Sequence, residues 1–312
     1  MLTLEQVLRA TQKDLAEKIR EEFAKDGVSL PILAKNKYLY VCPKQDTTPF
    51  LLVAHLDTVH HDRVKTICQS DNILMSPQGI GGDDRCGVYS LLYIYKNSPI
   101  HPYLLFTFNE EVGGLGALAF CDDFEKGNFQ ELKSVKCIIE LDRKGKNDAV
   151  YYEDTNEVFQ NYITSKGFKT QFGSFSDISY IAPTLNISAV NLSIGYHNPH
   201  TVGEYINLKQ MYKTIEKVIN IIKETEIKQF TYKRRERQID YFKDNAFLKY
   251  DDYNLAFSKT TTKKPKLHNE LEEQAYFELL DLYDEEELND IIETMGSDFL
   301  LDLYKTDILG EK

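Results

Sequence analysis

Short apolar runs alternate with longer segments of helical periodicity up to about residue 225 of the chain. The clearest apolar runs have the length of strands and are rich in Leu, Ile, Val and aromatic residues: 37–42, 49–54, 103–108, 135–141 and 187–194. Apolar residues three and four positions apart predict helices at 3–25, 86–96, 155–166 and 207–225, a shorter helix ending near 121, and a strand pair near 64–76.

Strands that alternate with helices in this way are typical of a parallel sheet, because parallel neighbours need a crossover connection between them. Runs that are apolar throughout also indicate strands buried on both faces. The pattern therefore predicts an α/β fold, a mostly parallel mixed sheet with helices on both faces. No internal repeat is visible in the sequence.

Polar residues of chemical interest stand where the predicted strands end. His55 and Asp57 follow the run 49–54, and side chains two residues apart in an extended backbone point the same way. A carboxylate in that position can hold one imidazole nitrogen while the other nitrogen binds a metal ion. Taken alone, this pair is more often a hydrogen bond that serves only the fold.

Further residues of the same kind follow other predicted strands or open helices. The set is His55, Asp83, Glu110, Glu111, Asp142 and His200. Since the carboxyl ends of parallel strands meet at one edge of a sheet, we expect these side chains to converge. Two imidazoles and three carboxylates, with one Glu to spare and no thiolate, suit two divalent ions, zinc first, with cobalt or manganese as alternatives. Neighbouring Glu110 and Glu111 diverge, so one can bind metal while the other holds the attacking water.

These residues, in this order and spacing, resemble the co-catalytic di-zinc exopeptidases, which include peptidase T, the aminoacylases and the single-domain zinc aminopeptidases. The matching segments are H-L-D-T-V at 55–59, G-G-D-D-R-C-G at 81–87, N-E-E-V-G-G-L-G-A at 109–117, E-L-D at 140–142 and H-T-V-G-E at 200–204. The resemblance thus covers about residues 50–205.

The resemblance implies a role for each residue. One zinc ion would be held by His55, Asp83 and Asp142 and the other by Asp83, Glu111 and His200, with Asp83 as the bridge. Asp57 would orient His55, and Glu110 would be the general base that moves a proton from the attacking water to the leaving amine. The peptide bond after the bridging residue, Asp83–Asp84, would be cis.

The chain also departs from that family. Residues 143–199 are too few for the lid domain of the peptidase T branch, and residues 56–82 are too few for the insertion of the tetrahedral aminopeptidases. We therefore expect the bare sheet-and-helix core. The group that polarises the substrate carbonyl stays open among Arg143, Tyr196 and His197.

Several nearby residues allow two interpretations. Arg85 either fixes a carboxylate or, at the start of a helix, pairs with Asp84 or an outer-shell acid, and Glu204 is expected to support His200. His60 and His61 are more typical of a solvated loop than of substrate contacts. Ser176 and Asp177 indicate a helix N-cap in preference to substrate contacts.

The uneven distribution of charge along the sequence divides the chain into three parts. Of the 312 residues 42% are hydrophobic, and the net charge of −12 is uneven, since residues 268–312 hold fifteen Asp or Glu against two Lys. The stretch 227–267 is mildly basic, with eleven Lys or Arg against five Asp or Glu. We predict a catalytic domain at 1–228, a linker at 229–267 and an acidic helical segment at 268–312, which could bind a protein partner.

Composition also indicates the cellular compartment and the kinds of partner to expect. The five cysteines are scattered and fit reduced thiols, and no apolar stretch has the length of a signal peptide or membrane span. We expect a cytoplasmic protein that binds neither membrane nor nucleic acid, since its basic residues are few.

The favoured function is hydrolysis of an amide bond in a small peptide by an aminopeptidase or tripeptidase. The alternatives are an N-acyl-amino-acid deacylase, a carboxypeptidase, and an inactive scaffold that binds a partner through its acidic segment. The presence of Glu110 favours an enzyme, because a base that is not a metal ligand is the residue most easily lost in an inactive relative.

Overall fold

The structure is a computed structural model that describes residues 1–26, 32–43, 47–224 and 226–234 and the positions 275, 276, 279, 288, 292, 301 and 304. The chain divides into two compact units, residues 1–238 and 239–312. All elements named below lie in the first unit.

An eight-stranded sheet forms the centre of the first unit, in the order β1-β2-β6-β3-β7-β10-β8-β9. Its four middle strands are mutually parallel: β6 (His101–Thr107), β3 (Thr47–His55), β7 (Cys137–Arg143) and β10 (Ala189–Ser193). Antiparallel pairings add β2 (Tyr38–Val41) and β1 (Ile32–Ala34) on one side and β8 (Asp148–Val150) on the other, where β9 (Lys169–Thr170) follows in parallel. The predicted mostly parallel mixed sheet is confirmed.

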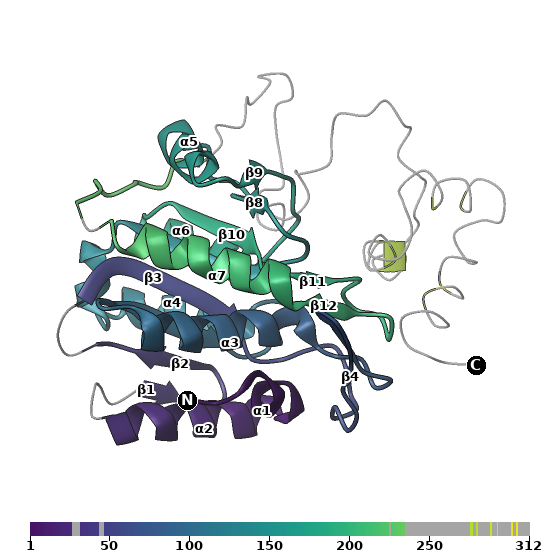
Figure 1. Cartoon of the computed structure of the whole chain (residues 1–312). Helices are drawn as coiled ribbons and strands as arrows, with labels where there is room; N and C mark the ends of the chain where they lie inside the picture. The colour runs from purple at the N-terminus through teal and green to yellow at the C-terminus, as the bar shows by residue number, and fades with distance from the viewer. Residues whose placement is uncertain are drawn as a thin grey trace. The chain divides into compact units, whose positions relative to one another are not determined.

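Helices cover both faces of this sheet (Figure 1). One buried cluster packs one face against α1 (Leu4–Arg9), α2 (Gln12–Asp26), α3 (Gly82–Asn97), α5 (Glu157–Ser165) and α7 (Leu208–Ile222). A second cluster packs the other face against α4 (Leu115–Glu125), α6 (Ile178–Leu185) and the 3-10 turn η1 (Gln130–Ser134). The helices thus enclose the parallel strands, whose residues are buried on both sides.

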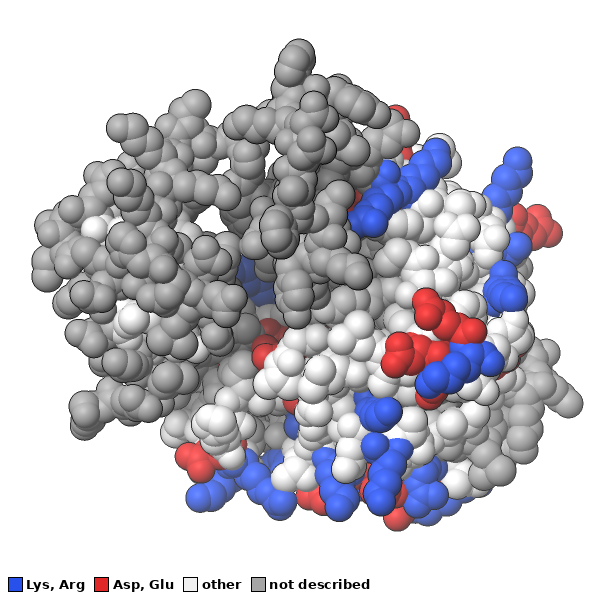
Figure 2. Space-filling model, turned by 180° about the vertical axis from the view of Figure 1, so that it is seen from behind, with Lys and Arg blue, Asp and Glu red and all other residues white. Residues whose placement is uncertain are grey.

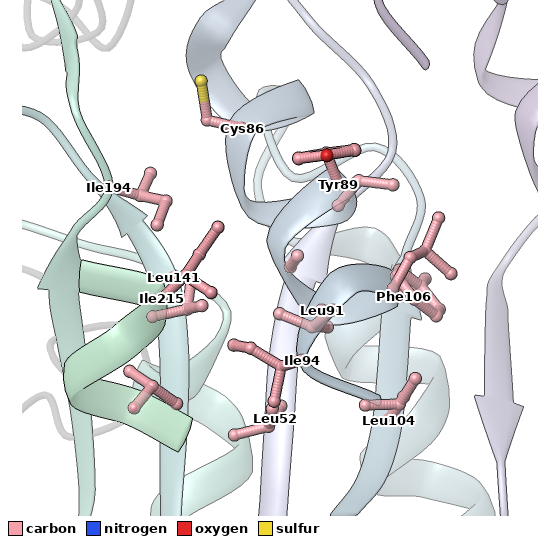
Figure 3. Packing of buried hydrophobic residues seen from close by; sticks show 14 of the residues in the cluster. Leu52, Cys86, Tyr89, Leu91, Ile94, Leu104, Phe106, Leu141, Ile194 and Ile215 are labelled. Carbon is pink, nitrogen blue, oxygen red and sulfur yellow. The ribbon is translucent and has the colours of Figure 1, made fainter. Parts of the chain in front are cut away.

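The packing of α3 on the sheet positions the start of that helix. Figure 3 shows Leu91 and Ile94 of α3 in one cluster with Leu52 of β3, Leu104 of β6 and Ile215 of α7. Burying an aliphatic side chain of this size contributes about 1.5–3 kcal/mol. The cluster therefore fixes α3 on the strands, with its first residues at their carboxyl ends.

Some elements differ from those the sequence predicts. The helix predicted over 3–25 is two helices, because Ala10 has extended backbone angles and ends α1. For α6 only the start was predicted, by the N-cap expected at Ser176 and Asp177; its extent was not, since the helix contains Pro183, a residue that normally interrupts a helix. The short strands β1, β8 and β9 were also not predicted.

A second, four-stranded sheet stands beside the first residues of α3. It has the order β11-β12-β5-β4 and consists of β11 (Tyr196–His197), β12 (Tyr205–Asn207), β5 (Ile73–Met75) and β4 (Cys68–Ser70), the last two being the strand pair predicted near 64–76. The loop between β11 and β12 carries His200. This sheet therefore holds that loop close to the start of α3.

Residues 229–234 continue along the first unit. The Ser188 amide donates to the Phe230 carbonyl at 2.7 Å, and the Thr155 amide donates to the Lys233 carbonyl at 2.8 Å. Most of the linker predicted at 229–267 and of the acidic segment predicted at 268–312 lies outside the described residues. In the second unit, the described residues with helical backbone form one buried cluster: Ala275, Tyr276, Leu279, Leu288, Ile292 and Tyr304, with Leu301 against them.

The described surface has a mixed charge. On the face that Figure 2 shows, Lys and Arg side chains are interspersed with Asp and Glu, with no continuous basic stripe among the described residues. In the described part of the chain, no helix has the length and apolarity that a membrane crossing requires.

Candidate metal centre and active site

The structure brings the six candidate residues to one edge of the central sheet. His55 ends β3, Asp142 lies near the end of β7, and the Glu110–Glu111 pair follows β6. Asp83 stands in the first turn of α3, and His200 comes from the loop after β11. The parallel order of the strands, as the sequence analysis expected, produces this convergence.

The first group of possible ligands contains His55, Asp83 and Asp142. His55 Nε2 lies 3.1 Å from Asp83 Oδ1 and 3.4 Å from Asp142 Oδ1. Ligand atoms at about 2.1 Å from a tetrahedral ion lie about 3.4 Å from each other. The donor atoms of this group are therefore spaced as a single ion requires.

The second group contains Asp83, Glu111 and His200. His200 Nε2 lies 3.4 Å from Asp83 Oδ2 and 3.3 Å from Glu111 Oε2. The two oxygens of Asp83 thus face different histidines, and its carboxylate stands between the two groups. Within each group the donor atoms lie within 4.8 Å of one another, which is also true of His55, Glu110 and Glu111.

The site contains several acidic groups close together, and their negative charges make it costly for all of them to be ionised at once. Burial, with the neighbouring Asp83 charge, raises the pKa of Asp142 to about 8. Burial also raises the pKa of Glu110 to about 9, with Asp142, Asp177 and Glu111 adding to the effect. Positive charge placed among these groups would stabilise their ionised forms. The donor set therefore fits one or two divalent cations.

The histidines respond to the same acidic surroundings. Hydrogen bonding to Asp83 and Glu111 raises the pKa of His200 to about 10. The pKa of His55 is also raised; burial opposes that shift, and Asp142 is the main group that favours it. In these acidic surroundings both imidazoles bind a proton more readily, and the positive charge of the proton takes the place that a metal cation would fill.

Asp57 contacts three parts of the site. Its Oδ1 lies 3.3 Å from His55 Nδ1, close to the imidazole but without the geometry of a hydrogen bond. It also accepts hydrogen bonds from the backbone amides of Glu110 and Glu111, at 3.0 and 3.1 Å. Although burial opposes it, these contacts lower the pKa of Asp57. The residue therefore fixes the turn after β6 and stands beside the imidazole.

The peptide bond Asp83–Asp84 is cis, as the resemblance implied. The buried Asp84 carboxylate accepts hydrogen bonds from the His55 amide at 3.2 Å and from the Gly87 amide at 2.9 Å. It therefore holds the backbone of His55, and its oxygens do not pair with Arg85 Nε or Nη1, which have no hydrogen-bond partner. Of the predicted Asp84–Arg85 pairing, the charge interaction is present, whereas a hydrogen bond to Nε or Nη1 is not.

Glu204 does not support His200 as the sequence analysis expected. Its side chain is fully buried and accepts hydrogen bonds from the Asp83 amide at 2.8 Å and the Gly81 amide at 2.9 Å. His60 Nε2 lies 2.9 Å from the same carboxylate. Glu204 thus supports the segment that carries Asp83. His60 was expected in a solvated loop, but it contacts this buried carboxylate.

A cavity of about 170 Å³ opens over the two groups and is lined by Glu110, Arg143, Tyr196 and His200 among others. The Tyr196 hydroxyl donates to the Asp142 carbonyl at 3.0 Å, and Arg143 Nη2 donates to the Phe172 carbonyl at 3.0 Å. His197 is not among the lining residues, and its ring stacks on Tyr205. Of the three carbonyl-polarising candidates, Arg143 and Tyr196 line this cavity.

The sequence analysis missed a buried polar layer under the metal groups. Ser176 donates to Glu140, and Thr107 donates to Asp177, where a helix N-cap was expected. Asp177 does occupy the N-cap position of α6, but its side chain makes no capping hydrogen bond. One signal was available, because Glu140 stands two residues before Asp142 on a strand and thus on the same face.

A second and larger cavity, of about 580 Å³, adjoins the site. Its walls come from the α1–α2 junction and the segments 57–64, 79–81 and 109–112, and Arg85 also lines it. Asp57 and Glu111 belong to its lining, so it begins where the metal groups end.

No family model matches the sequence, and no curated protein matches it significantly. Solved structures do match, and the fold of this chain is similar to that of several aminopeptidases and a tripeptidase. The aminopeptidase PepT from Bacillus cereus aligns with a TM-score of 0.57 and 16% identity, over 72% of this chain and 97% of that chain.

Two further solved structures agree. A tripeptidase from Staphylococcus aureus aligns with a TM-score of 0.54 and 15% identity over 71% of this chain and 96% of its own. An aminopeptidase from the archaeon Desulfurococcus kamchatkensis aligns with a TM-score of 0.54 and 14% identity over 72% and 94%. At these identities the likeness establishes the fold.

Proposed function

We propose that this chain is a metal-dependent exopeptidase that removes the N-terminal residue of short peptides. The observation that carries the proposal is the Asp83 carboxylate, whose two oxygens face the imidazoles of two separate ligand groups. The aminopeptidases and the tripeptidase that share the fold support the choice of a peptide as substrate.

In this proposal, His55, Asp83 and Asp142 hold one ion, and Asp83, Glu111 and His200 hold the other. Bound divalent ions, zinc in the first place, would supply Lewis acidity toward the scissile carbonyl and lower the pKa of an attacking water. Cobalt or manganese could replace zinc, because the ligands are nitrogen and oxygen atoms only.

Glu110 is the proposed general base, taking a proton from the attacking water and delivering it to the leaving amine. Two features of its setting support this role. Its carboxyl oxygen approaches the first ligand group, within 4.8 Å of a His55 ring nitrogen. Its backbone amide is held by Asp57 at 3.0 Å, which limits movement of the side chain. Arg143 and Tyr196, which line the same cavity, are the proposed contacts of the substrate carbonyl.

The five cysteines are free thiols, which supports a reducing compartment, and we propose the cytoplasm.

Metal analysis of two variants tests the proposal. The purified chain should carry about two zinc-like ions. Glu110→Gln should keep both and lose about 10²–10⁴-fold in turnover, because only proton transfer is removed. The same substitution at the neighbouring Glu111 is the matched control and should lower the metal content. An active Glu110→Gln variant, or a chain that holds one ion, would contradict the assignment.

A substrate panel separates the aminopeptidase from its alternatives. We expect turnover of unblocked dipeptides, tripeptides and aminoacyl anilides. Turnover confined to N-acyl amino acids would identify a deacylase, and turnover of N-blocked peptides with release of the last residue would identify a carboxypeptidase. A chain that binds zinc and hydrolyses none of these compounds would be the inactive scaffold.

A further inference from the structure

The cavity of about 580 Å³ beside the proposed metal centre has the size of a ligand pocket, for which about 300–1,000 Å³ is usual. Glu111 lines both this cavity and the smaller one above the metal groups. A substrate whose scissile bond lies at the metal groups can therefore occupy both spaces. The smaller cavity would take one part of a peptide and the larger cavity the rest.

Arg85 is the unusual residue of the larger cavity. It lines the cavity, yet only 4% of its surface is exposed, and the nitrogens Nε and Nη1 have no hydrogen-bond partner. A buried donor of a charged group without an acceptor is costly, and most such groups are paired. An arginine guanidinium keeps its charge in proteins.

The carboxylates next to Arg85 already bind other donors. Asp57 accepts hydrogen bonds from the amides of Glu110 and Glu111. Asp84 accepts hydrogen bonds from the amides of His55 and Gly87. Both acids compensate the charge of Arg85, but neither accepts a hydrogen bond from its Nε or Nη1.

Three other polar side chains of the cavity wall, Gln12, Asn109 and His60, already have hydrogen-bond partners. Gln12 Nε2 donates to Asn109 Oδ1 at 3.0 Å, and Gln12 Oε1 accepts from the Asn109 amide at 3.0 Å. His60 is bound to Glu204. Arg85 is thus a charged group of the wall whose Nε and Nη1 are buried without a partner, so the remaining nitrogen, Nη2, is the one that can face the cavity. A guanidinium donor of this kind selects a carboxylate as its partner.

We propose that the larger cavity holds the leaving part of a short peptide and that Arg85 binds the C-terminal carboxylate of that peptide. This inference rests on the proposed function and narrows its substrates to short peptides with a free C-terminus. Internal peptide bonds of long chains and C-terminally blocked peptides would be poor substrates, because nothing would satisfy the guanidinium.

A pair of substrates tests the inference on the zinc-loaded wild-type chain. Leu-Gly-Gly and its C-terminal amide differ only in the carboxylate, so the ratio of their kcat/KM values isolates its recognition. We expect the free acid to be favoured by about 10- to 100-fold, the range that a hydrogen bond to a charged group supplies. Equal kcat/KM values would overturn the inference and leave the proposed function intact.

Variants then assign the effect to a residue. Arg85→Gln should bring the ratio close to one, mainly through a higher KM for the free acid, and Arg85→Lys should restore part of it. The matched control is Arg63→Gln, because Arg63 lines the same cavity but is exposed and pairs with Asp14 at 3.5 Å. It should keep the wild-type ratio. Metal content and circular dichroism are measured for each variant.

The remaining outcomes are also decisive. If Arg63→Gln abolishes the ratio and Arg85→Gln preserves it, the carboxylate site has been assigned to the wrong residue. If Arg85→Gln loses metal and both activities together, Arg85 serves as an internal counter-charge for Asp57 and Asp84. If the wild-type chain hydrolyses neither peptide, the proposed function fails and this inference fails with it.

Discussion

Replacement of Glu204 by Gln tests how the fold holds its proposed bridging ligand. The Glu204 carboxylate is fully buried and accepts hydrogen bonds from the amides of Gly81 and Asp83, with His60 as a third partner. These bonds fix the backbone on both sides of Gly82, at the start of α3. Gln has nearly the same shape but offers one acceptor oxygen where Glu offers two.

The structure allows the cost to be worked out. If the Gln oxygen keeps the bond to the Asp83 amide, its NH₂ group must face the Gly81 amide, and a buried N–H then has no acceptor. An orphaned buried donor costs about 1–3 kcal/mol, and a neutral acceptor weakens the remaining bond further. We therefore expect a loss of about 2–4 kcal/mol in the free energy of unfolding. For a domain of this size, this lowers Tm by roughly 5–15 °C.

Metal binding should change as well. Supporting residues around a metal site typically contribute about 10- to 100-fold in affinity, and Glu204 places the backbone of Asp83. Urea unfolding of the metal-free protein, followed by circular dichroism because the chain has no Trp, measures the first effect. A zinc titration measures the second.

The control is Glu224→Gln. Glu224 also accepts hydrogen bonds, from Lys166 at 2.7 Å and Tyr162 at 3.1 Å, but its side chain is 41% exposed. Its loss should cost less than about 1 kcal/mol, as is usual for surface pairs. If Glu204→Gln unfolds at the wild-type urea concentration and binds zinc with wild-type affinity, Glu204 does not hold Asp83 in place.

Two further predictions concern the same region. Gly87→Ala should lower the yield of folded protein or abolish zinc binding, because the added Cβ would lie 2.1 Å from the Leu141 carbonyl oxygen. The control is Gly203→Ala, where the nearest atom to an added Cβ lies at 3.6 Å. It should match the wild type in thermal unfolding and metal analysis. Zinc is added to the metal-free protein at about a hundred times its dissociation constant. Each bound ion should then stabilise the folded state by about 2.7 kcal/mol, and two ions should raise Tm by roughly 10 °C or more. Chelator should reverse that rise, and a Tm indifferent to zinc would argue against a metal centre.

The positions of the candidate ligands were predictable because they follow from local signals. Each stands at the end of an apolar run or the mouth of a helix, and parallel strands place such ends together. His55, Asp142 and the Glu110–Glu111 pair needed no knowledge of distant contacts. The sheet itself was predictable for the same reason, since its middle strands are apolar on both faces.

The partners of the supporting residues were not predictable in this way. Glu204 is close to His200 in the chain, so local reasoning assigned it there, whereas the fold brings it to Gly81 and Asp83 on another segment. Ser176 likewise has the sequence of a helix cap but donates to Glu140 of β7, far from it in the chain. Contacts of this kind depend on how strands pair, and the chain's pattern does not contain that information.

Asp57 shows how the backbone can separate two roles within one pair of residues. Its two oxygens accept the consecutive amides of Glu110 and Glu111, which fixes both residues in a tight turn. Adjacent side chains held in this way project in different directions. Glu111 reaches His200 at 3.3 Å, and both Glu110 and Glu111 have a carboxylate oxygen within 4.8 Å of a His55 ring nitrogen. Under the proposed function, the division between a ligand and a base is therefore set by the turn, and any change that releases Asp57 should impair metal binding and proton transfer together.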